Sequence, residues 1–385
     1  MNHIISKSCA DAQAYIVPFR AKSHRSVSIA PEIDAAVDLA INGSFGGNLG
    51  ETYAMTLPAG DKLTSIILLG LGADRLSVRD IHTKAAQAFK QAKQLGAKHV
   101  AVMLDQLSEL SESAELFGAL ARLPQLVGYT NSGLKSNPEN KSLEQITFVT
   151  AADTLDAALS EAVATARGTV IARRLCNLRS NEQTPQSLAE DAAALGKEYG
   201  FDVQLFDKAA IEELGMESFL SVARGAHNTP PVLIVMRYLN GGDSPRIGLV
   251  GKGIVYDSGG YSIKTTPGMK NMFDDMGGAA AVIGAMTAVA DQKLKANVIG
   301  VIAACENKIA ADAYVPGDII GSMSGKTIEV ISADAEGRLT LADAVTYIQR
   351  KESCRFVADI ATLTGSAKTA VGKYSAAVLT NNEEL

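Results

Sequence analysis

The stretch IEVISADAEGRLTLADAVTYI, residues 328–348, shows most directly how this chain folds. Residues 328–331 are mostly apolar and predict a strand, and the apolar spacing of residues 339–348 predicts a helix. The short turn between them carries three charged side chains at alternate positions: Asp334, Glu336 and Arg338. Alternate residues of an extended turn point the same way, so we expect these three to converge. Most charged turns of this kind are merely solvated, so a functional site here needs support from the rest of the sequence.

Length and composition limit the classes of protein to which the chain can belong. The chain has 385 residues, which favours two domains, and it is 47% apolar and 20% charged. A formal net charge of -6 argues against nucleic acid or an anionic membrane as the main partner. No stretch is apolar for long enough to span a bilayer, residues 1–20 do not resemble a signal peptide, and the four cysteines are scattered without a C-x-x-C motif. We therefore expect a cytoplasmic protein with reduced thiols.

The first part of the chain, residues 1–152, has the pattern of a small α/β domain. Apolar runs predict strands at 14–19, 63–72, 99–104 and 145–151, and helical spacing predicts helices at 77–95 and 113–126. Strands and helices that alternate in this way predict a parallel sheet with both faces covered.

The second part predicts a larger α/β domain. The Ala-rich residues 153–178 read as a linker helix, and residues 179–385 as a catalytic domain with a mixed, mostly parallel sheet. Its expected strands lie at 203–206, 232–237, 247–250, 298–303 and 357–365, with a helix over 279–290 among others. The predicted fold class is thus α/β with two domains.

Four carboxylates of the second domain lie in glycine-flanked loops: Asp257, Asp275, Asp334 and Glu336. Two of them, Asp257 and Asp334, lie at or just past a predicted strand end. Ligands of open α/β sheets bind beyond the carboxyl ends of strands. Four crowded carboxylates repel one another unless cations neutralise them, and two divalent ions would balance their charge. Oxygen ligands suit Mg, Mn or Zn, and no histidine lies in these loops. Two metals bridged by carboxylates can hold a hydroxide and polarise a carbonyl, which predicts hydrolysis.

Two lysines accompany these loops. Lys252 lies between glycines at a predicted strand end, and Lys264 follows a double glycine. From spacing alone, a surface position is the simpler interpretation for both. A lysine next to metals can instead lose its proton and act as a ligand, or keep it and stabilise an oxyanion. The residues alone leave these roles open.

Several ordered motifs over residues 165–380 resemble the leucyl aminopeptidase (M17) family. They are Gly251–Gly253, Asp257–Gly260, Ser262–Lys264, Asp275–Ala280, Asp334–Leu339 and Ala361–Gly365. Tyr261 and the run Ser366–Ala370 further resemble its peptidase B branch. The first 150 residues resemble the family only in their α/β pattern.

The resemblance implies a site with two divalent metal ions, Mn or Zn. The tighter ion would be held by four residues: Lys252, Asp257, Asp275 and Glu336. The more exchangeable ion would be held by three: Asp257, Asp334 and Glu336. The resemblance makes Asp257 and Glu336 the bridging ligands.

Further roles come from the same resemblance. Lys264 would polarise the scissile carbonyl or bind the oxyanion, and Arg338 would hold a bicarbonate ion that accepts a proton from the bridging water. Five residues would border the substrate: Met272, Ser332, Thr362, Leu363 and Gly365. Ser332 stands where the family usually has an asparagine, so an amide near the substrate backbone is absent.

The implied function is a metal-dependent aminopeptidase that removes leucine-like and other N-terminal residues from small peptides. Family resemblance also implies a homo-hexamer, and it implies that a chain ending at Leu385 is C-terminally incomplete. Two alternatives stay open at this point. One is a catalytically weak structural or regulatory member of the same fold, and the other is a two-metal phosphoesterase that uses similar carboxylates.

Overall fold

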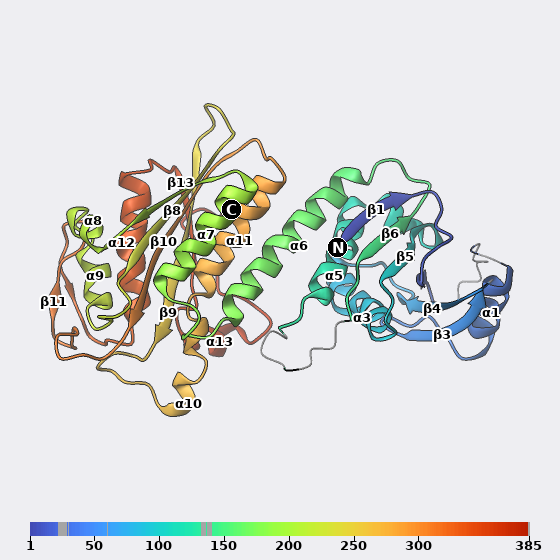
Figure 1. Cartoon of the computed structure of the whole chain (residues 1–385), viewed down its shortest axis with the longest axis horizontal. Coiled ribbons are helices and arrows are strands. Elements are labelled where there is room, and N and C mark those ends of the chain that lie inside the picture. Colours follow the sequence, from blue (N-terminus) through green and yellow to red (C-terminus); the bar gives the residue numbers. More distant parts are fainter. Residues whose placement is uncertain (22–28, 30, 60, 132–135, 137–140, 384–385) are drawn as a thin grey trace. The chain divides into compact units, whose positions relative to one another are not determined.

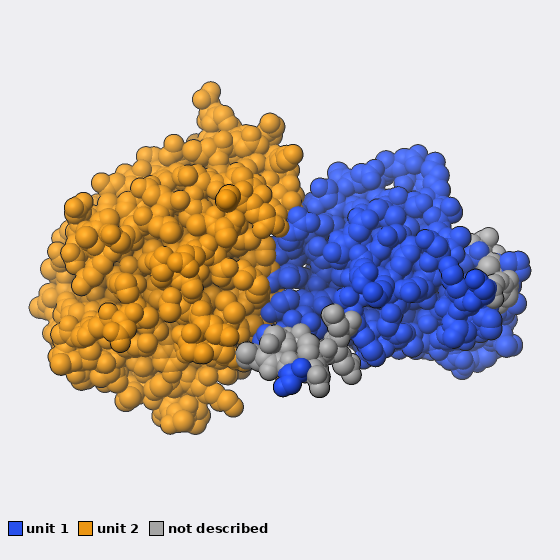
Figure 2. All heavy atoms as spheres, viewed as in Figure 1, with its two compact units in different colours: residues 1–170 blue, residues 171–385 orange. Residues whose placement is uncertain are grey.

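The computed structural model describes residues 1–21, 29, 31–59, 61–131, 136 and 141–383. It divides into two compact units, residues 1–170 and 171–385, which Figure 2 colours separately. The division falls within the helix α6 (Asp156–Asn177), where the sequence predicted a linker helix. Each unit has its own sheet and its own hydrophobic clusters, so the predicted two-domain α/β architecture is confirmed.

The sheet of unit 1 has the strand order β1-β6-β5-β2-β4-β3. The strands are β1 (Asn2–Ser6), β2 (Ala14–Phe19), β3 (Thr52–Ala59), β4 (Lys62–Gly70), β5 (His99–Met103) and β6 (Gln145–Val149). Neighbours pair in parallel except β3, which runs antiparallel to β4. The sequence did not predict β1 and β3. Both are edge strands with partly exposed residues, and so lack the continuous apolar run of buried strands.

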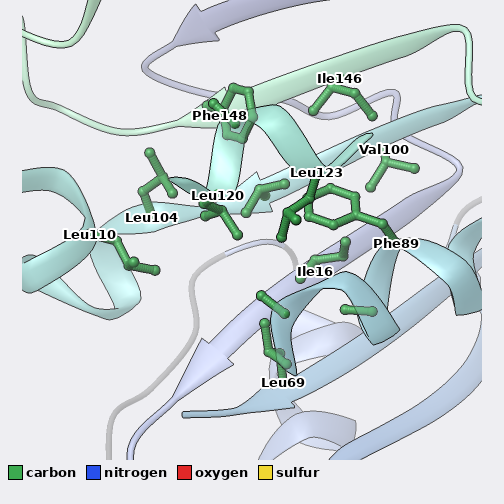
Figure 3. Close-up of a cluster of buried hydrophobic side chains, with 14 of the residues drawn as sticks. Ile16, Leu69, Phe89, Val100, Leu104, Leu110, Leu120, Leu123, Ile146 and Phe148 are labelled. Atoms are coloured by element: carbon green, nitrogen blue, oxygen red, sulfur yellow. The ribbon is translucent and has the colours of Figure 1, made fainter. Parts of the chain in front are cut away.

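Helices cover both faces of this sheet. Figure 3 shows Phe89 of α3 (Ala86–Gln94) and Leu120 of α5 (Ala114–Gly128) packed with Ile16 and Val100 of the strands. The opposite face packs against α1 (Pro31–Gly43), which the sequence did not predict. The shorter elements are α2 (Val78–Asp80), a π-helical turn (Ile81–Ala85), a 3-10 turn (Leu104–Gln106) and α4 (Ser108–Glu112).

Unit 2 contains a five-stranded sheet in the order β13-β9-β10-β8-β7. The strands are β7 (Asp202–Phe206), β8 (Val232–Leu239), β9 (Arg246–Asp257), β10 (Asn297–Asn307) and β13 (Phe356–Ile360). β13, β9 and β10 are mutually parallel, whereas β8 and β7 pair antiparallel. The sheet is therefore mixed, and its parallel pairs lie on the two sides of β9.

Helices form a layer on each side of this sheet, as Figure 1 shows. Pro185–Tyr199 (α7) and Gly277–Asp291 (α11) share a hydrophobic cluster with one face. Glu217–Ala223 (α9) and Glu336–Arg350 (α12) share a cluster with the other. The remaining elements are α8 (Lys208–Glu213), α10 (Thr266–Met269), a 3-10 turn (Met272–Asp274), β11 (Ile319–Ile320), β12 (Ile328–Glu329) and α13 (Gly365–Val371).

Two local predictions about unit 2 are wrong. The strand expected at 328–331 shrinks to β12, which pairs only with β11 in a separate two-stranded sheet. Val330 is instead buried in the cluster beneath α12, so its apolar side chain packs without joining the main sheet. Lys252 does not follow a strand end, because β9 continues to Asp257. The predicted helix after the turn is present as α12 and begins at Glu336.

Candidate metal centre

The strand β9 supplies two residues of the candidate site. Lys252 lies in its second half and Asp257 is its last residue, and the two are 2% and 1% exposed. On either side of β9 run its parallel neighbours β13 and β10. The carboxyl ends of three parallel strands therefore meet here, as the rule for ligand sites in α/β sheets predicts.

Lys252 is the centre of the first group of contacts. Its Nζ lies 2.8 Å from Asp275 Oδ2 and 2.8 Å from Glu336 Oε1, and it donates to the carbonyl of Thr362 at 3.1 Å. The hydroxyl of Thr362 in turn donates to Asp275 Oδ1 at 2.8 Å. Burial lowers the pKa of Lys252, but the two carboxylates outweigh it and raise that pKa above its usual value. The lysine is thus charged and fully engaged.

Glycines let this group form. A Cβ at Gly337 would lie 2.6 Å from Cε and 2.8 Å from Nζ of Lys252, so the lysine occupies the space that a side chain would take. A Cβ at Gly278 would lie 2.8 Å from the backbone nitrogen of Lys252. The start of α11 therefore approaches β9 closely, and this brings Asp275, just before α11, to the lysine.

Lys264 forms a second group with the remaining acids. Its Nζ lies 2.8 Å from Asp257 Oδ2 and 2.5 Å from Asp334 Oδ1. Burial lowers the pKa of Lys264, yet the hydrogen bonds and charges of these two carboxylates raise it well above its usual value. The side chains of Lys264 and Asp334 are 17% and 38% exposed, so this half of the site reaches solvent.

Three side chains hold the loop that carries Asp334. The carbonyl of Ala333 accepts from Asn307 Nδ2 at 2.9 Å and from the Tyr314 hydroxyl at 2.7 Å, and its N–H donates to Ser262 Oγ at 3.0 Å. Asn307 also donates to Asp257 Oδ1 at 2.8 Å. One buried amide therefore ties the end of β9 to the loop before α12.

Asn307 and Tyr314 were not among the site residues predicted from the sequence. Asn307 faces Asp257 in the parallel register of β9 and β10. The expected strand stopped four residues earlier, at 303, and an asparagine within a strand carries no signature of its own. A search for polar residues at strand ends would have found Asn307 only if the full length of β10 had been predicted.

The donor set fits divalent cations. Asp257, Asp334 and Glu336 each offer a carboxylate oxygen, and these atoms lie within 4.8 Å of one another. Glu336 Oε2 is buried and has no hydrogen-bond partner among the described residues. Burial raises the pKa of Glu336, and it raises that of Asp275 to about 7. Buried carboxylates with an unused oxygen are what a hard or borderline cation requires.

The other predicted site residues lie in different surroundings. Arg338 is exposed in the first turn of α12, and no ion pair or hydrogen bond joins its side chain to another described residue, whereas Asp334 and Glu336 offer ligand atoms within 4.8 Å of each other. Ser332 Oγ accepts from the Asp334 N–H at 3.2 Å. Met272 is half-buried in the 3-10 turn, whereas Leu363 and Gly365 are exposed near the start of α13.

Carboxylates and lysines gathered at the strand ends of an α/β unit are typical of metal-dependent hydrolases. Comparison with known proteins makes the assignment specific. Residues 170–385 match the catalytic domain of the cytosol aminopeptidase family, and residues 28–138 match the N-terminal domain of the same family. The chain belongs to this M17 peptidase family, which is metal-dependent.

Comparison with individual proteins supports the same family assignment. The chain is 41% identical to a probable cytosol aminopeptidase of Clostridium perfringens, over all of this chain and 79% of that protein. It is 42% identical to one of Fusobacterium nucleatum, over 89% of this chain and 69% of that protein. A solved mutant of tomato leucine aminopeptidase superposes with a TM-score of 0.84 at 29% identity, covering 97% of this chain and 76% of the other. Within the described residues, no helix is long and apolar enough to cross a membrane.

Proposed function

We propose that the chain is a two-metal aminopeptidase that removes leucine-like and other N-terminal residues from small peptides. The observation that carries this proposal is the group of Asp257, Asp334 and Glu336, whose ligand atoms lie within 4.8 Å of one another. These three would hold one divalent ion, Mn or Zn. Lys252, which would release its proton as the ion binds, and Asp275 would join Asp257 and Glu336 around the second. When bound, the two ions would polarise the scissile carbonyl and activate water.

Lys264 is proposed to stabilise negative charge on the carbonyl oxygen. Its two carboxylate partners hold the ammonium group in place, and its partial exposure leaves a side open to substrate. A cation fixed before the reaction costs no reorganisation when charge develops. Arg338 has the exposure that binding a bicarbonate ion requires, and this anion would accept a proton.

Asp275 is proposed to receive the free amino group of the substrate. Its Oδ1 accepts from Thr362, which places it beside the segment 362–365 that is expected to border the substrate. A carboxylate for the terminal amine explains why residues would be removed one at a time from the N-terminus. A homo-hexamer and a cytosolic location, the latter in keeping with the relatives' names, belong to the same proposal.

The test uses the full chain, stripped of metal and then supplied with Mn²⁺. Leucine p-nitroanilide should be hydrolysed, and its N-acetyl derivative should not, because the free amine is blocked. Asp334→Ala should lower kcat by at least about 100-fold, since one ligand and one partner of Lys264 are lost. Asp243→Ala, which removes an exposed loop carboxylate, is the matched control.

Other outcomes would point elsewhere. Metal binding without hydrolysis would favour the catalytically weak member of the fold, and hydrolysis of p-nitrophenyl phosphate alone would favour a phosphoesterase. Unchanged activity in Asp334→Ala would contradict the assigned site. Light scattering of the same sample tests the hexamer separately.

A further inference from the structure

Unit 1 contains a second group of metal-binding side chains. Cys9 and Asp11 lie in the connection between β1 and β2, and His99 is the first residue of β5. Cys9 Sγ lies 3.6 Å from Asp11 Oδ1 and 3.7 Å from His99 Nε2, and His99 Nδ1 lies 3.8 Å from Asp11 Oδ1. One ligand atom from each residue falls within 4.8 Å of the others.

We propose that Cys9, Asp11 and His99 bind a single zinc-like divalent cation. A thiolate, an imidazole and a carboxylate together select a borderline-soft ion such as Zn²⁺ rather than Mg²⁺. Around tetrahedral zinc, such donors stand about 3.3–3.6 Å apart, given the usual zinc–ligand distances. Two separations of the proposed donors, 3.6 Å from Cys9 Sγ to Asp11 Oδ1 and 3.8 Å from Asp11 Oδ1 to His99 Nδ1, lie within a few tenths of an ångström of these values. Water would fill the fourth position, as in other sites with three protein ligands.

The surrounding contacts hold the donors in place. Thr147 Oγ1 and Gln145 Nε2 lie 2.9 Å and 3.2 Å from His99 Nε2, so Nδ1, on the side of Asp11, is the nitrogen proposed for the metal. Gln13 Oε1 accepts from the His99 backbone N–H at 3.2 Å, and the Tyr15 hydroxyl donates to the Cys9 carbonyl at 2.9 Å. Metal-binding histidines usually have their second nitrogen fixed in this way.

A cysteine nucleophile with a histidine base would use the same residue types, but the arrangement differs. In such a relay the histidine stands between the acid and the thiol. Here His99 faces Cys9 Sγ through Nε2 and Asp11 through Nδ1, but Asp11 Oδ1 also lies 3.6 Å from Cys9 Sγ, so the three groups form a triangle. The ring nitrogen nearer the sulfur already contacts Thr147. A triangle of donors suits a shared cation.

Cobalt distinguishes this site from the carboxylate centre of unit 2, because only a thiolate ligand gives a near-ultraviolet sulfur-to-cobalt charge-transfer band. The metal-free full chain would be titrated with Co²⁺ alone. We expect the band to appear with half-saturation at micromolar Co²⁺, or about 10⁻⁶ M. Cys9→Ser should abolish it, and Asp11→Asn and His99→Gln should weaken binding at least about 10-fold.

Control variants decide where the band originates. Cys354→Ser and Cys305→Ser should keep it, the latter being buried on β10 of unit 2. The Asp11 side chain is 79% exposed, so Asp11→Asn should fold even if Cys9→Ser does not. In a parallel experiment, Zn²⁺ should protect Cys9 from alkylation, mapped by mass spectrometry. No band, a band lost in Cys305→Ser, or half-saturation above about 1 mM would overturn the proposal.

Discussion

The two lysines of the carboxylate centre, Lys252 and Lys264, differ in their exposure to solvent. The buried one stabilises the site, whereas the partly exposed one is free to take part in catalysis. Both bridge two acids, Lys252 between Asp275 and Glu336, and Lys264 between Asp257 and Asp334. Lys252 is on a central strand with a side chain only 3% exposed, whereas the Lys264 side chain is on a loop and 17% exposed.

The exposure of each lysine determines what it can contribute. Lys252 neutralises two buried acids, and with the Thr362 carbonyl these partners occupy the three donors of its ammonium group. Lys264 keeps a solvent-facing side, and one of its partners, Asp334, reaches water as well. Removing Lys252 should therefore damage stability and activity together, and removing Lys264 should damage activity more than stability.

Lys252→Met should have the largest effect. In the metal-free chain it leaves two buried carboxylates without their cation, which typically costs about 3–5 kcal/mol. Urea unfolding in the presence of EDTA measures this, and hydrolysis of leucine p-nitroanilide should also disappear.

The cause of that loss can be checked with a second substitution. Adding Glu336→Gln to Lys252→Met should recover part of the stability, because it removes one unpaired charge. Lys208→Met, which breaks an exposed pair with Glu212, should cost less than about 1 kcal/mol. If Lys252→Met were as mild as Lys208→Met, the ion pairs of Lys252 would not hold the site.

Lys264→Met should lower kcat by about 10²–10³-fold, the usual effect of removing one preorganised donor to an oxyanion. The loss of stability should be smaller than in Lys252→Met, because Asp334 is exposed and Asp257 Oδ1 keeps its hydrogen bonds from Gly259 N–H and Asn307 Nδ2. Lys270→Met, an exposed lysine after α10, is the matched control. A change in KM without a change in kcat would show that Lys264 binds substrate rather than stabilising the reaction's charge.

Gly337→Ala should have a smaller effect that acts through Lys252. The new Cβ would stand 2.6–2.9 Å from three atoms of the lysine side chain, which must move by several tenths of an ångström. We expect Mn²⁺ affinity to fall roughly 10-fold, as for other residues that position ligands. Gly43→Ala, where a Cβ would meet nothing within 4 Å, should leave Mn²⁺ binding unchanged. Equal Mn²⁺ affinity in both variants would contradict the packing argument.

The carboxylates of the site could be predicted from sequence because strand ends and glycines mark them. Asp257 ends β9 and Asp334 lies in the loop before α12. Because ligands of α/β sheets bind beyond the carboxyl ends of strands, the sequence predicted that these two carboxylates belong to one site. The fold class followed from alternating apolar runs in the same way. The M17 resemblance supplied the remaining roles, which no spacing rule gives.

The burial of Lys252 could not be predicted from sequence. Its spacing in the sequence favoured a surface position, because nothing in a linear pattern shows that Gly337 leaves space for its side chain. The roles of Asn307 and Tyr314 were hidden for a similar reason, since their partner is a backbone carbonyl at Ala333. The prediction of a strand over 328–331 was wrong because an apolar residue can be buried by packing alone, as Val330 is. Such contacts depend on three-dimensional neighbours.

His3 shows the converse of Lys252, because it is a half-buried base that meets positive charge rather than carboxylates. It lies on β1, and burial lowers its pKa to about 4, helped by the positive charges of the N-terminal amine and Arg167. The unfolded chain binds a proton at His3 below pH about 6.5, whereas the folded chain does so only near pH 4. Stability from this group is therefore complete above pH 6.5 and is lost as the pH falls towards 4.

His3→Gln should flatten this part of the pH profile by about 1–2 kcal/mol, the smallest effect expected here. Hydrogen exchange of the β1 and β6 peptides between pH 7 and 4.5, corrected for intrinsic exchange rates, measures it in unit 1. Above about pH 7 both forms carry a neutral residue 3, so the variant should differ there only by lost packing. A profile that keeps the same slope in His3→Gln would show that another group titrates, and the contrast with Lys252 would then rest on the carboxylates of unit 2 alone.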